Sequence, residues 1–175
     1  MEQVLVVIKP EGVKRGIVGK VLTEFHGGGL TLQGLKLVKP SAPLVKKHYA
    51  ALNGKLFFKQ IVDHLTGKFH DGAPVVAMVL KVAHAVKHCR KIAGATNPKD
   101  ASPTSIRGKY GRINKGLFEN IVHVSSSHED AEREIKLWFK KSELVKEPSI
   151  FEQRAKESTI LYKTLVKNLR DKGKL

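Results

Sequence analysis

Short runs of apolar, mostly β-branched residues are the feature that most constrains how this chain can fold. The two strongest runs are residues 3–8 and 75–82, and both are far shorter than the roughly 20 residues that a membrane-spanning helix needs. Short runs bounded by proline or glycine are typical of buried strands. Residues 30–38 alternate well enough to form a further strand, and residues 119–124 predict a fourth. The sequence therefore predicts a sheet of short strands.

Segments with apolar residues at helical spacing separate these strands. One begins at Ile17 and ends at Gly27–Gly29, which we interpret as a helix C-cap and turn because the glycines follow a helix instead of opening one. Two helical pieces lie between Pro43 and Leu65, and residues 66–73 form a loop. Two later helices carry the core-facing residues Ala85, Val86, Cys89 and Ile92, and Ala131, Ile135, Trp138 and Phe139.

The order of these elements reduces to βαββαβ. It predicts an α+β fold, a ferredoxin-like antiparallel sheet with helices packed on one face. The chain length fits one domain, which we place at residues 1–147. Residues 93–118 show no periodicity, and a loop of this length is usually functional or disordered.

A C-terminal amphipathic helical extension is expected at residues 148–175. After Pro148, residues 150–169 place one apolar stripe on a helix, formed by Phe151, Ala155, Tyr162, Leu165 and Leu169. We expect this stripe to dock on the domain or on a neighbouring subunit.

The single cysteine, Cys89, excludes an intrachain disulfide and a cysteine-based zinc site. A reducing compartment is therefore expected, and we predict a cytoplasmic protein. The first residues lack the apolar stretch of a signal peptide, and no apolar run could span a bilayer, so no membrane association is expected.

The chain is strongly basic, with 32 Lys and Arg against 16 Asp and Glu and a formal charge of +16. Such a surface attracts polyanions and steers anionic small molecules, so non-specific binding of nucleic acid is expected. The charges are scattered from Lys14 to Lys174. This spread favours general basicity over a dedicated nucleic-acid site.

Candidate functional residues include His123, which lies in an apolar run just before the turn Ser125–Ser127. A lone histidine in such a place is most often a hydrogen-bonded core residue. Lys9 ends the first strand. Taken alone, Lys9, Arg90 and Arg107 would each be interpreted as a solvated surface charge. Arginine is nevertheless the side chain best shaped to bind phosphate oxygens.

Two large classes of phosphotransferase are excluded, because the chain has neither the P-loop motif nor the protein-kinase signatures. His84 and His88 stand four residues apart, as metal ligands on a helix can, but no acidic residue lies nearby in the sequence. We interpret both as surface residues.

Several further blocks of sequence surround the candidate residues. They are, in order, Lys9–Val13, Arg15–Gly19, His48-Tyr49, Phe57-Phe58, Pro74–Val79, Ala95–Pro98, Ser105–Gly108, Asn120–His123 and Ala131–Phe139. The same blocks in this order are typical of nucleoside diphosphate kinases, which the chain resembles over about residues 3–145. The family's fold is the ferredoxin-like sheet that the periodicity also predicts.

The resemblance implies a two-step phosphate exchange that maintains NTP and dNTP pools. His123 would take the γ-phosphate of a nucleoside triphosphate as phosphohistidine and pass it to a nucleoside diphosphate. The family implies roles for further residues as well. Lys9 and Tyr49 would lie beside the transferred phosphate, and Arg90, Thr96 and Arg107 would hold the phosphate chain. Phe57 would stack on the base, Lys9 and Asn120 would reach the ribose, and Glu134 and Ser125 would support the histidine. The resemblance also implies Mg²⁺ carried by the nucleotide phosphates without protein side-chain ligands, and a homo-hexamer or tetramer.

The chain departs from the family pattern at four places. Val124 stands where the family usually has glycine, and Ser126 where it usually has aspartate. A few extra residues lie between Phe57 and Pro74, and others between Arg107 and Asn120. Val124 and Ser126 leave open an alternative, a catalytically weakened member that acts as a nucleotide- or nucleic-acid-binding protein.

An RNA-recognition domain is a second alternative, because it shares the βαββαβ order. Such domains stack bases on aromatic residues of their central strands. The two candidate central strands here, Val4–Ile8 and Val75–Val82, contain no aromatic residue. The RNA-recognition interpretation is therefore disfavoured.

Overall fold

The computed structural model describes residues 1–114, 116–145, 158–164 and 166–167. The chain divides into two compact units, Met1–Val145 and Lys146–Leu175. The predicted boundary after residue 147 falls outside the described residues and stays a prediction. All elements named below belong to the first unit.

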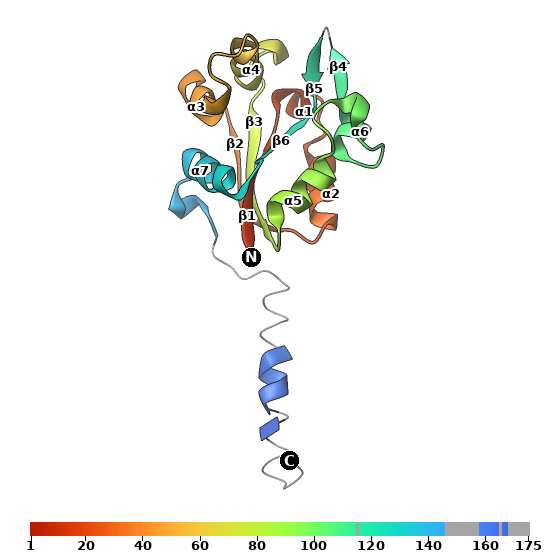
Figure 1. Ribbon diagram of the computed structural model, residues 1–175, viewed down its shortest axis with the longest axis vertical. Coiled ribbons are helices and arrows are strands. Elements are labelled where there is room, and N and C mark those ends of the chain that lie inside the picture. Colours follow the sequence, from red (N-terminus) through yellow and green to blue (C-terminus); the bar gives the residue numbers. More distant parts are fainter. Residues whose placement is uncertain (115, 146–157, 165, 168–175) are drawn as a thin grey trace. The chain divides into compact units, whose positions relative to one another are not determined.

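A four-stranded antiparallel sheet forms the centre of this unit (Figure 1). Its strands are β1 (Glu2–Ile8), β2 (Thr31–Val38), β3 (Val75–Val82) and β6 (Val122–Val124), in the order β2-β3-β1-β6. The register pairs Leu5 of β1 with Val79 of β3, and Val7 with His123 of β6. The predicted ferredoxin-like arrangement is thus confirmed.

Seven helices and a small hairpin are packed around the sheet in the described residues of this unit. The helices are α1 (Pro10–Lys14), α2 (Val18–Gly27), α3 (Ala42–His48), α4 (Phe58–Leu65), α5 (Ala85–Ala93), α6 (Ile106–Tyr110) and α7 (His128–Trp138). The hairpin joins β4 (Arg112–Asn114) to β5 (Leu117–Glu119), and short 3₁₀ turns are η1 (Ala50–Leu52), η2 (Lys68–His70), η3 (Pro98–Asp100) and η4 (Lys141–Glu143).

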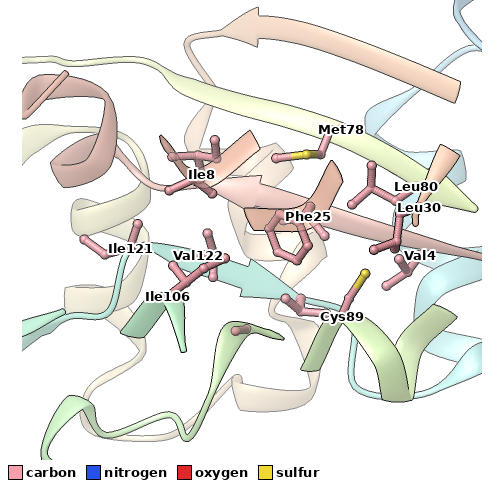
Figure 2. Packing of buried hydrophobic residues seen from close by; sticks show 14 of the residues in the cluster. Val4, Ile8, Phe25, Leu30, Met78, Leu80, Cys89, Ile106, Ile121 and Val122 are labelled. Carbon is pink, nitrogen blue, oxygen red and sulfur yellow. The ribbon is translucent and has the colours of Figure 1, made fainter. Parts of the chain in front are cut away.

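Helices cover both faces of the sheet, so the prediction of helices on one face is wrong. Val4, Val6 and Ile8 of β1 face the core that α2 and α5 close, and Figure 2 shows part of this packing. Leu5 and Val7 point the other way, into a second core that α3, α4 and α7 close. Successive side chains of a strand point to opposite faces, and a strand buried on both faces needs an unbroken apolar run.

The predicted fourth strand is shorter than expected. Residues 119–124 do not form one strand, because Ile121 adopts a left-handed conformation with φ of 69° and β6 begins only at Val122. Residues 93–118, predicted as one irregular loop, contain η3, α6 and most of the β4–β5 hairpin. These elements are only three to five residues long, too short for a periodic pattern.

In the C-terminal unit, residues 158–164 and 166–167 are helical, within the predicted helix at residues 150–169. Of the predicted apolar stripe, Tyr162 is described and exposed, while Phe151, Ala155, Leu165 and Leu169 lie outside the described residues. Docking of this stripe stays a prediction. In the described part of the chain, no helix combines the length and hydropathy that membrane crossing requires.

Candidate active site

His123 lies in the middle of the short strand β6, next to β1, with 15% of its side chain exposed. Its ring Nε2 is 2.9 Å from Oε2 of Glu134 and donates a hydrogen bond to this carboxylate. The Ser125 hydroxyl donates to the same oxygen at 2.7 Å. Because Nε2 carries the proton in this hydrogen bond, the lone pair of Nδ1 stays available for reaction.

Helix α7 brings Glu134 to the imidazole. Ser127 caps the helix by accepting a hydrogen bond from the Asp130 amide at 3.1 Å. The buried stripe of α7 then contains Ala131, Glu134, Ile135 and Trp138, at the spacing of one helix face. Glu134 thus occupies a core-facing position, and its buried carboxylate is satisfied by the histidine and the serine.

A second histidine, His48, packs against the first. The ring centroids of His48 and His123 are 4.3 Å apart with the planes at 75°. The Trp138 indole N–H donates to His48 Nδ1 at 3.1 Å, and burial is the main cause that lowers the pKa of His48 to about 2. His48 is therefore neutral near pH 7, and its ring packs against the reactive ring. The sequence interpretation missed it, although it precedes Tyr49 in a matched block.

The Tyr49 ring also lies against the reactive histidine, with its centroid 5.8 Å from that of His123. Burial is the main cause that raises the pKa of the Tyr49 hydroxyl above its ordinary value. The phenol therefore stays protonated and can donate a hydrogen bond at neutral pH.

Lys9, Asn120 and Thr96 form a connected group. The Lys9 ammonium donates to Oδ1 of Asn120 at 2.7 Å, and the Asn120 amide donates to the Thr96 carbonyl at 2.8 Å. Burial lowers the pKa of Lys9 below its ordinary value. The three residues come from the end of β1, the segment after α5 and the turn before β6, so one hydrogen-bonded chain ties the three segments together.

Arg107 is buried and joins two backbone segments next to the site. Its guanidinium donates to the Gly94 carbonyl at 2.7 Å and to the Val122 carbonyl at 2.8 Å, and its buried Nε has no hydrogen-bond partner in the described part of the chain. Burial and the charge of Arg90 lower the pKa of Arg107 to about 10, so it remains charged at neutral pH. Arg90 is exposed in the last turn of α5 and lines an open hollow of about 450 Å³ that Ser126 also lines.

The turn that places Asn120 and His123 is held by Glu11. Ile121 has a φ of 69°, which is strained for a β-branched residue. Its amide donates to Glu11 Oε1 at 3.1 Å, and its carbonyl accepts from the Lys9 amide at 2.8 Å. A Cβ on Gly12 would come within 2.9 Å of the Ile8 side chain, so glycine is needed where α1 approaches this turn. The sequence interpretation gave Glu11 no role.

Phe57 is the predicted residue that the structure does not bring to His123. It forms the N-cap of α4 with 48% of its surface exposed, and no hydrogen bond or ring contact links it to His123 in the part of the chain that the structure describes. An exposed aromatic ring can stack on a base, and this role of Phe57 stays a prediction.

Neither departure beside the histidine distorts the site. Val124 is in extended conformation within β6, pairs with Val6 and is 4% exposed in the core under α5. Ser126 is exposed, and its hydroxyl donates to the Asp130 carboxylate in the first turn of α7. A carboxylate is therefore present near the position where the family usually has aspartate.

The residues around His123 suit a phosphate chain better than a bare metal ion. Mg²⁺ prefers oxygen ligands, and Glu134, the carboxylate in contact with the His123 ring, is already hydrogen-bonded to that ring and to Ser125. His48, His123 and Glu134 offer ligand atoms within 4.8 Å of one another, but Trp138 occupies one His48 nitrogen. The cations Lys9, Arg90 and Arg107 favour phosphate oxygens instead.

An imidazole with one free nitrogen, oriented by a carboxylate and flanked by lysine and arginine on a ferredoxin-like sheet, has the features of a phosphotransferase. The family model described as nucleoside diphosphate kinase matches residues 2–144. The chain is 44% identical over 144 residues to the nucleoside diphosphate kinase of Pyrococcus furiosus, covering 82% of this chain and 86% of that protein. This chain therefore belongs to the nucleoside diphosphate kinase family.

Two solved structures are also similar. A halophilic nucleoside diphosphate kinase from Halobacterium salinarum in complex with CDP has a TM-score of 0.75 and 38% identity, covering 84% of this chain and 93% of that one. The nucleoside diphosphate kinase from Borrelia burgdorferi, a transition state mimic with bound vanadate and ADP, has a TM-score of 0.77 and 30% identity. It covers 84% of this chain and 92% of that one.

Proposed function

We propose that this nucleoside diphosphate kinase carries the transferred phosphoryl group on Nδ1 of His123. The observation that carries the proposal is the hydrogen bond of His123 Nε2 to Glu134, which leaves the opposite ring nitrogen as the free nucleophile. Ser125 fixes the carboxylate by donating to the same oxygen, so the imidazole has one orientation. A neutral imidazole so held is a good nucleophile near neutral pH.

The reaction proceeds in two balanced steps. In the first, the lone pair of His123 Nδ1 forms a bond to the γ-phosphorus of a nucleoside triphosphate. The bond from that phosphorus to the bridging oxygen breaks, and the nucleoside diphosphate leaves. In the second, the terminal phosphate oxygen of a different nucleoside diphosphate attacks the phosphohistidine, the N–P bond breaks and Nδ1 recovers its lone pair.

Positive charge stabilises the transferred group in both steps. Lys9 and the Tyr49 hydroxyl lie next to the phosphoryl group, and Arg90, Thr96 and Arg107 hold the phosphate chain. The exposed side chain of Arg90 and the charge of the buried Arg107 support these assignments, because guanidinium groups suit phosphate oxygens. Glu134 also stabilises the positive charge that the ring gains when it is phosphorylated.

The nucleoside is bound through few specific contacts. Phe57 stacks on the base, and Lys9 with Asn120 reaches the ribose. Stacking on an exposed ring uses the π-face that every base has, so it allows nucleotides of different bases to bind. The relatives bound to CDP and to ADP support such tolerance. Mg²⁺ enters with the nucleotide, where it neutralises charge on the phosphate oxygens.

Assembly and location follow from the same resemblance. We propose a homo-hexamer or tetramer, which the edge strand β2 supports because it exposes Leu32, Leu35 and Leu37 at 47%, 47% and 65%. We also propose a cytoplasmic location, and non-specific, salt-sensitive attraction of nucleic acid by the +16 charge. The catalytically weakened alternative has no support from the similar proteins.

Phosphate trapping tests the proposal. The protein is mixed with γ-labelled ATP and Mg²⁺ without acceptor, and GDP is added afterwards. We expect an acid-labile, base-stable phosphoprotein that GDP discharges. His123→Ala should take up no label, while His128→Ala, at an exposed histidine at the start of α7, should behave as the wild type does. Label that persists in His123→Ala would place the nucleophile elsewhere.

A further inference from the structure

A second cluster of titratable side chains lies away from the reactive histidine. Glu11, His64 and His70 are all buried, and their potential ligand atoms lie within 4.8 Å of one another. His64 Nε2 is 2.8 Å from Glu11 Oε2, and His70 Nε2 is 3.9 Å from the same oxygen. His70 is 6% exposed, and its Nε2 is buried without a hydrogen-bond partner among the residues that the structure describes.

A buried nitrogen without a partner needs an explanation, because a polar group that is buried and unsatisfied destabilises the fold. The unpartnered Nε2 of His70 is a nitrogen of the kind that binds metal ions. The nearest acceptor, Glu11 Oε2, is already bonded to His64. Three groups therefore converge on one point with only one hydrogen bond among them.

The segment that contains the two histidines includes a turn that requires glycine at residue 67. His64 lies in the last turn of α4, and His70 ends η2. Gly67 between them has a φ of 84°, and a Cβ there would come within 2.5 Å of the Ala73 carbonyl, so the chain can double back only with glycine at this position. His64 and His70 both lie between Phe57 and Pro74, where the sequence has residues beyond the family pattern.

The donor set selects a class of cation. Two imidazole nitrogens and one carboxylate oxygen are the ligands of zinc and related divalent transition metals, whereas Mg²⁺ and Ca²⁺ prefer oxygen alone. Two ligand atoms of one tetrahedral zinc ion lie roughly 3.3 Å apart. The separations of 2.8 Å and 3.9 Å from Glu11 Oε2 lie on either side of this value, so small side-chain rotations suffice. We propose that Glu11, His64 and His70 bind a zinc-class divalent metal ion.

Glu11 is oriented for this role. Its Oε1 accepts the Ile121 amide, which leaves Oε2 directed to the two imidazoles. A hydrogen bond that fixes a ligand from behind is the usual support of a metal site. Burial raises the pKa of Glu11, but the His64 hydrogen bond and the charge of Lys9 outweigh it, and the pKa lies below its ordinary value.

An open coordination position faces solvent. Glu11 and His70 line a hollow of about 250 Å³ together with Glu119. Two of the three cations that line it are paired with carboxylates, Lys14 with Asp71 and Arg112 with Glu119, each at 2.5 Å, and the third, Arg15, donates to the Tyr110 carbonyl. The hollow can therefore admit a hydrated cation and a water ligand. The ion would link α1, α4 and η2, and through Glu11 it would support the strained Ile121 turn.

Cobalt(II) provides a direct probe, because its visible absorption becomes strong when the ion has four or five ligands. The full-length protein is stripped with chelator and titrated with Co²⁺, and Zn²⁺ is then added to displace it. We expect intense absorption that saturates at one Co²⁺ per chain and is lost with Zn²⁺. His70→Gln should weaken binding by at least about tenfold. His84→Gln, at an exposed histidine, and His123→Gln, at the other histidine cluster, should leave it unchanged.

A second measurement needs no variant. Zn²⁺ should shift the Nε2 resonances of His64 and His70 in ¹⁵N NMR spectra and should raise the thermal midpoint of the wild type. Absence of a saturable Co²⁺ spectrum, its persistence in His70→Gln, or shifts confined to His48 and His123 would overturn the proposal. Phosphate transfer by His70→Gln without metal should equal that of the wild type, so this test is independent of the proposed catalytic roles.

Discussion

Val124→Gly should destabilise the protein without changing its chemistry. The Val124 side chain is 4% exposed and packs in the core under α5. Its burial contributes about 1.5–3 kcal/mol, and glycine within a strand costs a further 0.5–1 kcal/mol or so. We therefore expect the free energy of unfolding to fall by roughly 2–4 kcal/mol, and the thermal midpoint by roughly 5–15 °C.

Urea unfolding followed by the fluorescence of Trp138, the single tryptophan, measures this loss. The protein concentration must be held constant, because subunit association would shift the midpoint. Val124→Ala is the matched control. It should lose less free energy of unfolding than Val124→Gly, because alanine restricts the backbone more than glycine does. Turnover per folded molecule should stay within about twofold of the wild type, because less than 1 kcal/mol of barrier change is expected. Unchanged stability with severalfold faster turnover would refute the reasoning, since Val124 would then restrain the nucleophile instead of packing the core.

Three further predictions concern the groups around the histidine. Glu134→Gln should lower kcat by about 10–100-fold, because it removes a charge-assisted hydrogen bond of about 1.5–3 kcal/mol; steady-state kinetics with little change in KM would agree, and wild-type kcat would not. Asn120→Ala should raise the nucleotide KM by about tenfold, since Lys9 loses its anchor; isothermal titration with a nucleoside diphosphate checks this. His48 binds a proton below its ordinary pKa of 6.5 in the unfolded state, but only near pH 2 in the folded state. The free energy of unfolding should therefore decrease as the pH is lowered from 6.5 towards 2. His48→Gln should flatten that dependence by up to about 1.4 kcal/mol per pH unit, and urea midpoints at a series of pH values would show an unchanged slope if His48 is not the cause.

The sheet could be predicted because its strands are long and apolar. β3 has the predicted bounds, Val75–Val82, and β1 differs from its prediction by one residue at the N-terminal end. The burial of both faces could also have been inferred, since the run from Val4 to Ile8 is unbroken and does not alternate. Helices on one face would have left Leu5 and Val7 exposed to water.

Other parts of the fold depend on contacts that the sequence does not display. The turn at Ile121 is held by Glu11, which is distant in the chain, and local preference argues against a β-branched residue there. The elements between residues 98 and 119 are too short to show a period. A long-range hydrogen bond decides the first case, and the shortness of the elements decides the second.

The candidate site could be predicted largely from the family resemblance, and the structure adds the connections. It links His123 to Glu134 and Ser125, and Lys9 to Asn120. It also reveals His48, whose importance arises from packing against His123 and not from its place in the sequence.

The most direct test of the proposed mechanism is to identify which nitrogen of His123 carries the phosphate. The phosphoprotein formed from ATP and Mg²⁺ without acceptor can be denatured in base and examined by ³¹P NMR, which separates the two phosphohistidine isomers. The hydrogen bond from Nε2 to Glu134 predicts phosphate on Nδ1. Phosphate on Nε2 of His123, or on another residue, would contradict the account.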